Sequence, residues 1–178
     1  MGMYTEFVMA AQIKNDPTVV QILNYMVNGG PMPEELPNHD FFKIVNWQYD
    51  LFFDSYYFPG TTNTTFVKND LHGAAKEPLY FLTVRCNLKN YCNDIDKFLD
   101  WLCPYIIDPE DGFLGYSRYE ECDDPRLIYI HDNKIVYHGF THVNSDFLEN
   151  LKEQPPTFVD DCYVSSSRYS EEVEVCHS

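Results

Sequence analysis

The chain has 178 residues, of which 44% are hydrophobic and 16% aromatic. This composition excludes a wholly disordered chain and suffices for one domain with a sizeable core. Its 28 acidic and 12 basic residues give a formal net charge of −16, which opposes direct binding to nucleic acid or to an anionic membrane surface.

The N-terminal region predicts a strand followed by a capped helix. Mixed alternation of apolar and polar residues predicts the strand over residues 4–14. Asp16 is suited to cap a helix that begins with Pro17 at its first position. The apolar stripe of this helix ends before Gly29, a residue typical of helix C-termini.

Two further strands are predicted before residue 80. The first covers residues 42–57, where apolar and aromatic residues alternate: Val45, Trp47, Tyr49, Leu51 and Phe53. The second covers residues 62–68, and the polar residues 69–78 are predicted to form a hairpin loop.

Residues 79–121 predict a strand, a helix and a second strand. In the first strand one set of alternate residues is predicted to face the core: Tyr80, Leu82, Val84, Cys86 and Leu88. Asn93 is suited to cap a helix with apolar residues at helical spacing, and Pro104 limits its length. Residues 113–120 resume as a strand.

The C-terminal region predicts a hairpin and then a polar segment. Strands over 127–130 and 134–137 flank a predicted turn at 131–133. We therefore expect an α+β fold, with two helices on one face of a mainly antiparallel sheet. A ferredoxin-like core with extra strands is the simplest such arrangement. We expect one domain over residues 1–154 and a polar, acidic extension over residues 155–178.

Cysteine and histidine residues provide no clear metal or cofactor motif. The six cysteines form no C-x-x-C pair and match no zinc-finger spacing. Cys86 and Cys103 lie on apolar faces and are expected in the core. His131, His138 and His142 are close in sequence, and a metal-dependent hydrolase built on them is the least favoured hypothesis. We expect no catalytic residue, no metal and no cofactor.

Two charged surfaces are candidates for binding. The basic one lies on the predicted outer face of neighbouring strands, at Arg85, Lys89 and Arg118, where it could bind a small anionic nucleotide. The acidic one has its members in a turn and in the extension: Glu120, Glu121, Asp123, Asp124, Asp160 and Asp161. An acidic surface can bind a basic protein surface, including one that normally holds nucleic acid.

Five segments together resemble a family of small acidic proteins of bacteriophages and prophages. They are residues 55–58 (SYYF), 82–91 (LTVRCNLKNY), 96–106 (DKFLDWLCPYI), 113–121 (FLGYSRYEE) and 125–129 (PRLIY). The resemblance covers about residues 4–130. It implies a phage accessory protein that acts in the host cytoplasm, and it supplies no catalytic residues.

The leading hypothesis is a non-enzymatic phage protein that binds and inhibits a host defence protein through its acidic surface. We expect a partner with a basic surface, no direct contact with nucleic acid, and no membrane association, because no run of about 18 apolar residues occurs. The N-terminus lacks the basic region of a signal peptide. The alternative is a sponge for a nucleotide signal, with its site between the subunits of a homo-oligomer.

Overall fold

The structure is a computed structural model. The residues it describes are 4–51, 63–69, 78–107, 109, 112–122, 124–140 and the backbone of 169–174.

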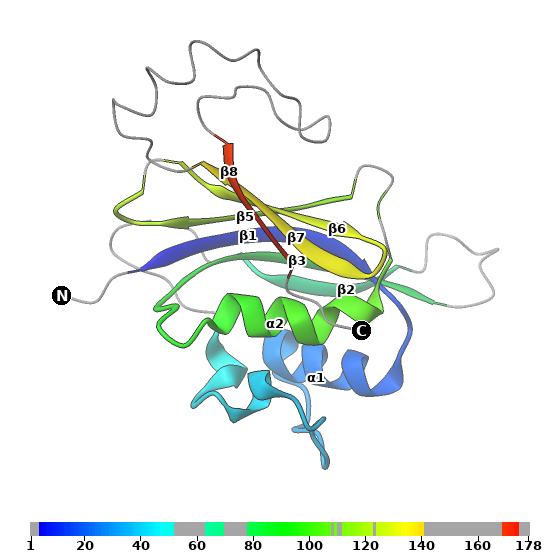
Figure 1. The fold of residues 1–178 in the computed structure, drawn as a ribbon. Helices are drawn as coiled ribbons and strands as arrows, with labels where there is room; N and C mark the ends of the chain where they lie inside the picture. Colours follow the sequence, from blue (N-terminus) through cyan, green and yellow to red (C-terminus); the bar gives the residue numbers. More distant parts are fainter. Residues whose placement is uncertain are drawn as a thin grey trace, which may run out of the picture.

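These residues form two α-helices, short 3-10 helices and the strands of one sheet (Figure 1). The strands are β1 (Thr5–Ile13), β2 (Thr65–Asn69), β3 (Leu79–Leu88), β4 (Ile106–Ile107), β5 (Phe113–Tyr119), β6 (Arg126–His131), β7 (Lys134–Phe140) and β8 (Tyr169–Glu174). The helices are α1 (Pro17–Asn28), α2 (Asp94–Leu102), η1 (Asp40–Lys43), η2 (Trp47–Tyr49) and η3 (Cys103–Tyr105).

The strand order is β2-β3-β1-β5-β6-β7-β8, and all the paired strands are antiparallel. The four neighbouring strands β2, β3, β1 and β5, with α1 after β1 and α2 after β3 in the chain, have the ferredoxin-like order. Both helices lie on the same face of the sheet (Figure 1). The predicted α+β fold with a mainly antiparallel sheet is therefore confirmed, and β6, β7 and β8 are the extra strands. Within the segment predicted as an extension, the structure describes β8, which pairs with β7.

The first helix forms as its sequence predicts. Asp16 Oδ1 accepts hydrogen bonds from the backbone N–H groups of Thr18 and Val19, each at 3.0 Å, and Pro17 occupies the first helical turn. Gly29 ends the helix in the left-handed conformation, at φ 67°.

The core lies between the two helices and the sheet. From the strands it takes alternate side chains, and the predicted inner face of β3 is buried except for the half-buried Tyr80. From the helices it takes residues at helical spacing: Val19, Ile22, Leu23 and Met26 of α1, with Ile95, Phe98, Leu99, Trp101 and Leu102 of α2. Cys86 and Cys103 are buried, as expected, and neither forms a disulfide.

The strand predicted over residues 42–57 is wrong for its described part. Residues 40–49 form η1 and η2, with Trp47 buried and Val45 83% exposed. Aromatic packing explains the difference, because the Phe41 ring stacks on Trp101 of α2 at 5.6 Å between centroids. The Trp47 ring packs edge-on against Phe42 at 5.0 Å. These ring contacts bury Phe41 and Trp47, so the segment does not need to pair with a neighbouring strand to cover them. Residues 52–57 lie outside the described part of the chain.

The N-terminus of α2 is capped differently from the prediction. Asn93 adopts a left-handed conformation, at φ 56°, and its side chain makes no capping hydrogen bond. Instead Asn90 Oδ1 accepts from the backbone N–H of Ile95 at 3.0 Å. The helix ends at Leu102, and Pro104 lies in η3.

The hairpin β6–β7 is joined to α2 through one carboxylate. Asp132 and Asn133 both have positive φ, at 50° and 59°, which is the two-residue turn that suits a hairpin. Asp96 Oδ1 of α2 accepts from Arg126 Nη2 and from the Tyr137 hydroxyl, each at 2.7 Å. The Arg126 guanidinium lies 3.8 Å from the centre of the Tyr137 ring. Asp96 therefore fixes the extra strands to the core.

We expect Gly115→Ala to destabilise the fold by about 2–3 kcal/mol, because overpacking forces the backbone to shift. A Cβ at Gly115 would collide with the carbonyl oxygen of Val8 and lie 2.7 Å from Cα of Met9 on β1. Gly139→Ala is the matched control in β7, since its Cβ would have only an ordinary contact, at 3.9 Å. Urea unfolding measures both variants, and equal stabilities would contradict this account.

We also expect a coupling free energy of about 1.5–3 kcal/mol between Asp96 and Tyr137, the range for a hydrogen bond to a charged group. The double-mutant cycle uses Asp96→Ala, which removes the acceptor, and Tyr137→Phe, which removes the donor, measured by urea unfolding. Additive effects would show that the 2.7 Å hydrogen bond does not hold the hairpin on α2.

Candidate functional site

A hollow of about 360 Å³ lies where the ends of several elements meet. The residue before β1, the C-terminal end of β3, the start of α2 and the segment around η2 all contribute to it. Its lining residues are Tyr4, Val45, Asn46, Asp50, Leu88, Lys89 and Asp94. A second hollow adjoins it and shares Val45, Lys89 and Asp94.

Two carboxylates that line the first hollow are buried, and each has one oxygen without a hydrogen-bond donor. Asp50 and Asp94 are each 8% exposed. In the described part of the chain, no group donates to Asp50 Oδ2 or to Asp94 Oδ1. A buried polar atom without a partner costs about 1–3 kcal/mol, and more when the group is charged. The wall of the hollow therefore contains two buried acceptor atoms that the described residues leave without a donor.

Burial changes the acidity of both groups. Burial, and secondarily the neighbouring Asp94 carboxylate, raises the pKa of Asp50 to about 7. Burial also raises the pKa of Asp94, and the Lys97 ammonium on the next turn of α2 partly opposes this. Burial, with a contribution from Asp50, raises the pKa of the Cys86 thiol as well. Asp50 therefore changes its charge near neutral pH.

The predicted acidic turn lies beside this hollow. The backbone N–H of Glu120 donates to the carbonyl oxygen of Tyr4 at 3.0 Å, and that of Cys122 donates to Tyr119 at 2.9 Å. Glu121 and Asp124 are exposed, whereas Glu120 is half-buried. Asp123, Asp160 and Asp161 lie outside the described residues.

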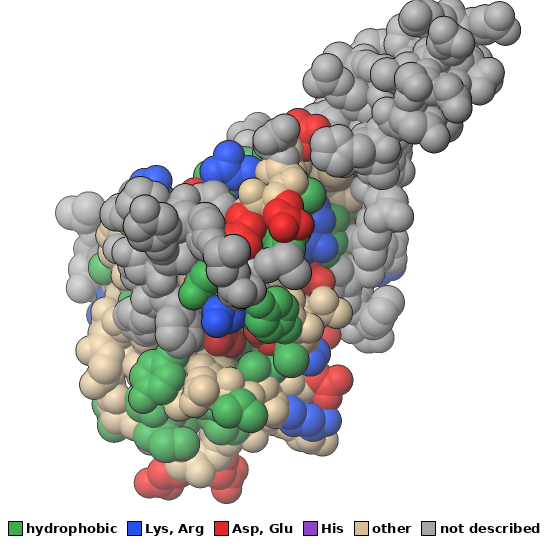
Figure 2. All heavy atoms as spheres, turned by 90° about the vertical axis from the view of Figure 1, so that its left-hand side faces the viewer, with side chains coloured by type: hydrophobic (Ala, Val, Ile, Leu, Met, Phe, Trp, Pro, Cys, Tyr) green, Lys and Arg blue, Asp and Glu red, His purple; other side chains and the backbone are tan. Residues whose placement is uncertain are grey.

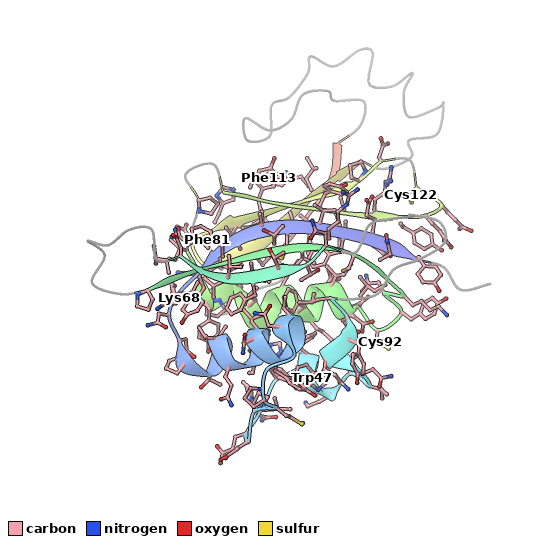
Figure 3. The ribbon with its side chains drawn as sticks, turned by 180° about the vertical axis from the view of Figure 1, so that it is seen from behind. Trp47, Lys68, Phe81, Cys92, Phe113 and Cys122 are labelled. Carbon is pink, nitrogen blue, oxygen red and sulfur yellow. The ribbon has the colours of Figure 1, made fainter. Side chains whose placement is uncertain are left out.

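The hollow and the turn belong to one side of the molecule. Cys92, which lines the second hollow, and Cys122 of the turn lie on the same side (Figure 3). Figure 2 faces this side and shows acidic side chains, with basic ones among them, above a group of exposed hydrophobic side chains. Val45 and Tyr91, which line the hollows, are 83% and 61% exposed. We call this combination of turn, hollows and exposed hydrophobic residues the acidic face.

Two of the three predicted basic residues, Arg85 and Arg118, lie on the sheet face opposite the helices. On this face, Val8 of β1 has Arg85 of β3 as its partner on one side and Tyr116 of β5 on the other. Arg118 Nη2 pairs with the buried Glu6 carboxylate at 3.0 Å. The Lys89 ammonium lies 5.5 Å from the centre of the Tyr4 ring, at the edge of the first hollow. A nucleotide bound here would compete with Glu6 for Arg118.

Two of the three candidate histidines lie around one aromatic ring. His131 stacks on Tyr129 at 6.2 Å between centroids, and His138 lies edge-on to Tyr129 at 5.1 Å. His142 lies outside the described residues. Among the residues that the structure describes, no group of three or more His, Cys, Asp or Glu side chains is arranged to hold a metal ion.

Comparisons with protein-family models, with curated proteins and with solved structures found no match to this chain. None of the helices in the described part of the chain is long and apolar enough to cross a membrane.

Asp50 is a site residue that the sequence patterns did not predict. Asp50 stands alone among apolar and aromatic neighbours, in Trp47-Gln48-Tyr49-Asp50-Leu51. A single carboxylate in such a stretch is a signal of a buried acid, because charged residues are rarely buried without a reason. Asp94 follows the predicted cap Asn93, where an acid is explained by the helix dipole alone, so its sequence position does not indicate a site.

We expect Asp50→Asn to stabilise the protein at about pH 8 by about 2 kcal/mol, and to have little effect near pH 4. An unfolded aspartate has a pKa near 3.8, whereas folded Asp50 has one of about 7. The folded state binds the proton more tightly between these values, so the stability of the parent protein falls as the pH rises through this window.

Urea unfolding at both pH values measures the effect. Asp132→Asn is the control, since Asp132 is exposed in the β6–β7 turn. A variant less stable than the parent protein near pH 8 would show that the Asp50 carboxylate has a stabilising partner.

Proposed function

We propose that this chain is a non-enzymatic binding protein whose acidic face occupies a basic surface of a protein partner. The observation that carries this proposal is the position of the exposed acidic turn beside two buried carboxylates, each with one oxygen that has no hydrogen-bond donor among the described residues. Tyr4 connects the two, because its carbonyl oxygen accepts from Glu120 and its side chain lines the hollow.

The charge distribution supports the proposal. Two arginines of the described residues are paired internally, Arg118 with Glu6 and Arg126 with Asp96. Lys43 pairs with Asp40 at 2.6 Å. Acidic neighbours neutralise these basic side chains, and the net charge of the chain is −16. The electrostatic field outside the protein is therefore negative. A negative field accelerates association with a basic protein surface and repels nucleic acid.

The resemblance to phage proteins supports a more specific proposal. A phage accessory protein would act in the host cytoplasm, where a defence protein with a basic nucleic-acid groove is a suitable target. An acidic face inserted into such a groove would exclude the nucleic acid, and it would need no catalytic residue.

We expect capture of the partner to depend strongly on salt and on the acidic turn. The immobilised chain is incubated with host-cell extract at about 50 mM salt, and retained proteins are identified by mass spectrometry. Surface charges are screened within about 10 Å at 0.1 M ionic strength, so raising the salt to about 0.5 M should release the partner.

The double variant Glu121→Gln with Asp124→Asn should retain several-fold less of that partner, because two exposed charges of the acidic face are removed. Glu34→Gln with Glu35→Gln is the matched control, because it removes the same charge from exposed residues of the loop after α1. Equal loss in both double variants, or retention that salt does not change, would contradict the proposed function.

A further inference from the structure

The two buried carboxylates that line the first hollow are candidate groups for binding a cationic ligand. Asp50 and Asp94 reach it from different elements, and each has an oxygen that is buried and without a hydrogen-bond donor. Both side chains are more than nine-tenths buried. These two oxygens lie just behind the surface of the hollow, so a ligand reaches them when the carboxylates turn towards it. A group with several N–H donors and a positive charge would offset that rearrangement.

We propose that this hollow accepts the guanidinium group of an arginine side chain from the partner protein. This inference rests on the proposed function for the source of the arginine. The volume of about 360 Å³ is an order of magnitude larger than the roughly 30 Å³ of one water molecule. A guanidinium, with its alkyl stem, fits such a space.

The lining favours a guanidinium over other cations. A planar guanidinium presents five N–H donors and is weakly hydrated, so it can satisfy two carboxylates at a low desolvation cost. Val45 and Leu88 offer apolar walls for the methylene stem. Ca²⁺ would need about six to eight oxygen ligands, whereas the lining offers two carboxylates and the Asn46 amide.

The exposed residues around the opening suit a protein ligand. Val45 and Tyr91 are 83% and 61% exposed, and the acidic turn adjoins Tyr4. A buried charged anchor surrounded by apolar and aromatic contacts that exclude water is the usual arrangement of a binding hot spot.

Several titratable groups act on this site, and they set its pH dependence. Lys89 at the rim and Lys97 on α2 are positive, whereas Asp94 on α2 is the nearest acid to act on Asp50. The Tyr4 hydroxyl and the buried Cys86 thiol complete the set. Since a guanidinium binds the ionised form of Asp50, its affinity should rise between about pH 6 and pH 8.

The test uses the full chain and N-acetyl-L-arginine amide as the probe, followed through the ¹³C carboxyl signals of the aspartates by NMR. We expect the Asp50 and Asp94 signals to shift with a Kd on the order of 1 mM, near the affinity of a single anchoring contact. The probe N-acetyl-citrulline amide has almost the same shape and no charge, and it should produce no shift.

Three variants make the test specific. Asp50→Asn should weaken binding of the probe at least tenfold. We expect this variant protein to fold stably. Lys89→Gln should tighten binding several-fold, because it removes a positive charge from the rim. Glu34→Gln with Glu35→Gln should leave the Kd unchanged.

Equal shifts with the citrulline probe, no shift at Asp50 and Asp94 up to about 20 mM probe, or displacement of the probe by millimolar Ca²⁺ would each overturn the inference. The two proposals fail separately. Probe binding without salt-dependent partner capture would overturn the proposed function, whereas partner capture that Asp50→Asn does not weaken would overturn the arginine site.

Discussion

The antiparallel ladders on both sides of β1 are the constraint on which the rest of this structure depends. β1 pairs with β3 from Thr5 to Ile13 and with β5 from Thr5 to Met9. This position places Phe7 and Met9 under the helices and Glu6 on the opposite face, between Asn87 and Arg118. The close approach of β5 requires Gly115. Because Tyr4 directly precedes β1, the same ladders determine where the acidic turn and the hollow meet.

Much of the fold could be predicted from local patterns. The alternation in β3, the Asp16 cap and the hairpin turn at Asp132-Asn133 each depend on neighbours a few residues apart. The error at residues 42–49 arose because Phe41 and Trp47 are buried by rings of the segment itself and of α2. Alternation along the chain carries no information about such long-range ring contacts.

The candidate site was only partly predictable, for a related reason. Glu121 and Asp124 could be named because exposed acids in a turn are visible as composition. Asp50 and Asp94 are separated by more than forty residues in sequence, and only the packing of the η2 segment against the start of α2 brings them to one hollow. The raised pKa of Asp50 is likewise a product of burial, which the fold creates.

The two parts of the acidic face differ in how they would act on a basic partner. Exposed charges such as Glu121 attract over distances near the Debye length, so they affect the association rate and weaken in salt. Buried carboxylates act only on a group that enters the hollow, and water and salt screen them little. The unfavourable burial of Asp50 and Asp94 in the free protein is offset when a cation reaches them. In the proposed complex, the turn therefore supplies the attraction that salt screens and without which the partner is released, and the hollow determines which basic surface fits.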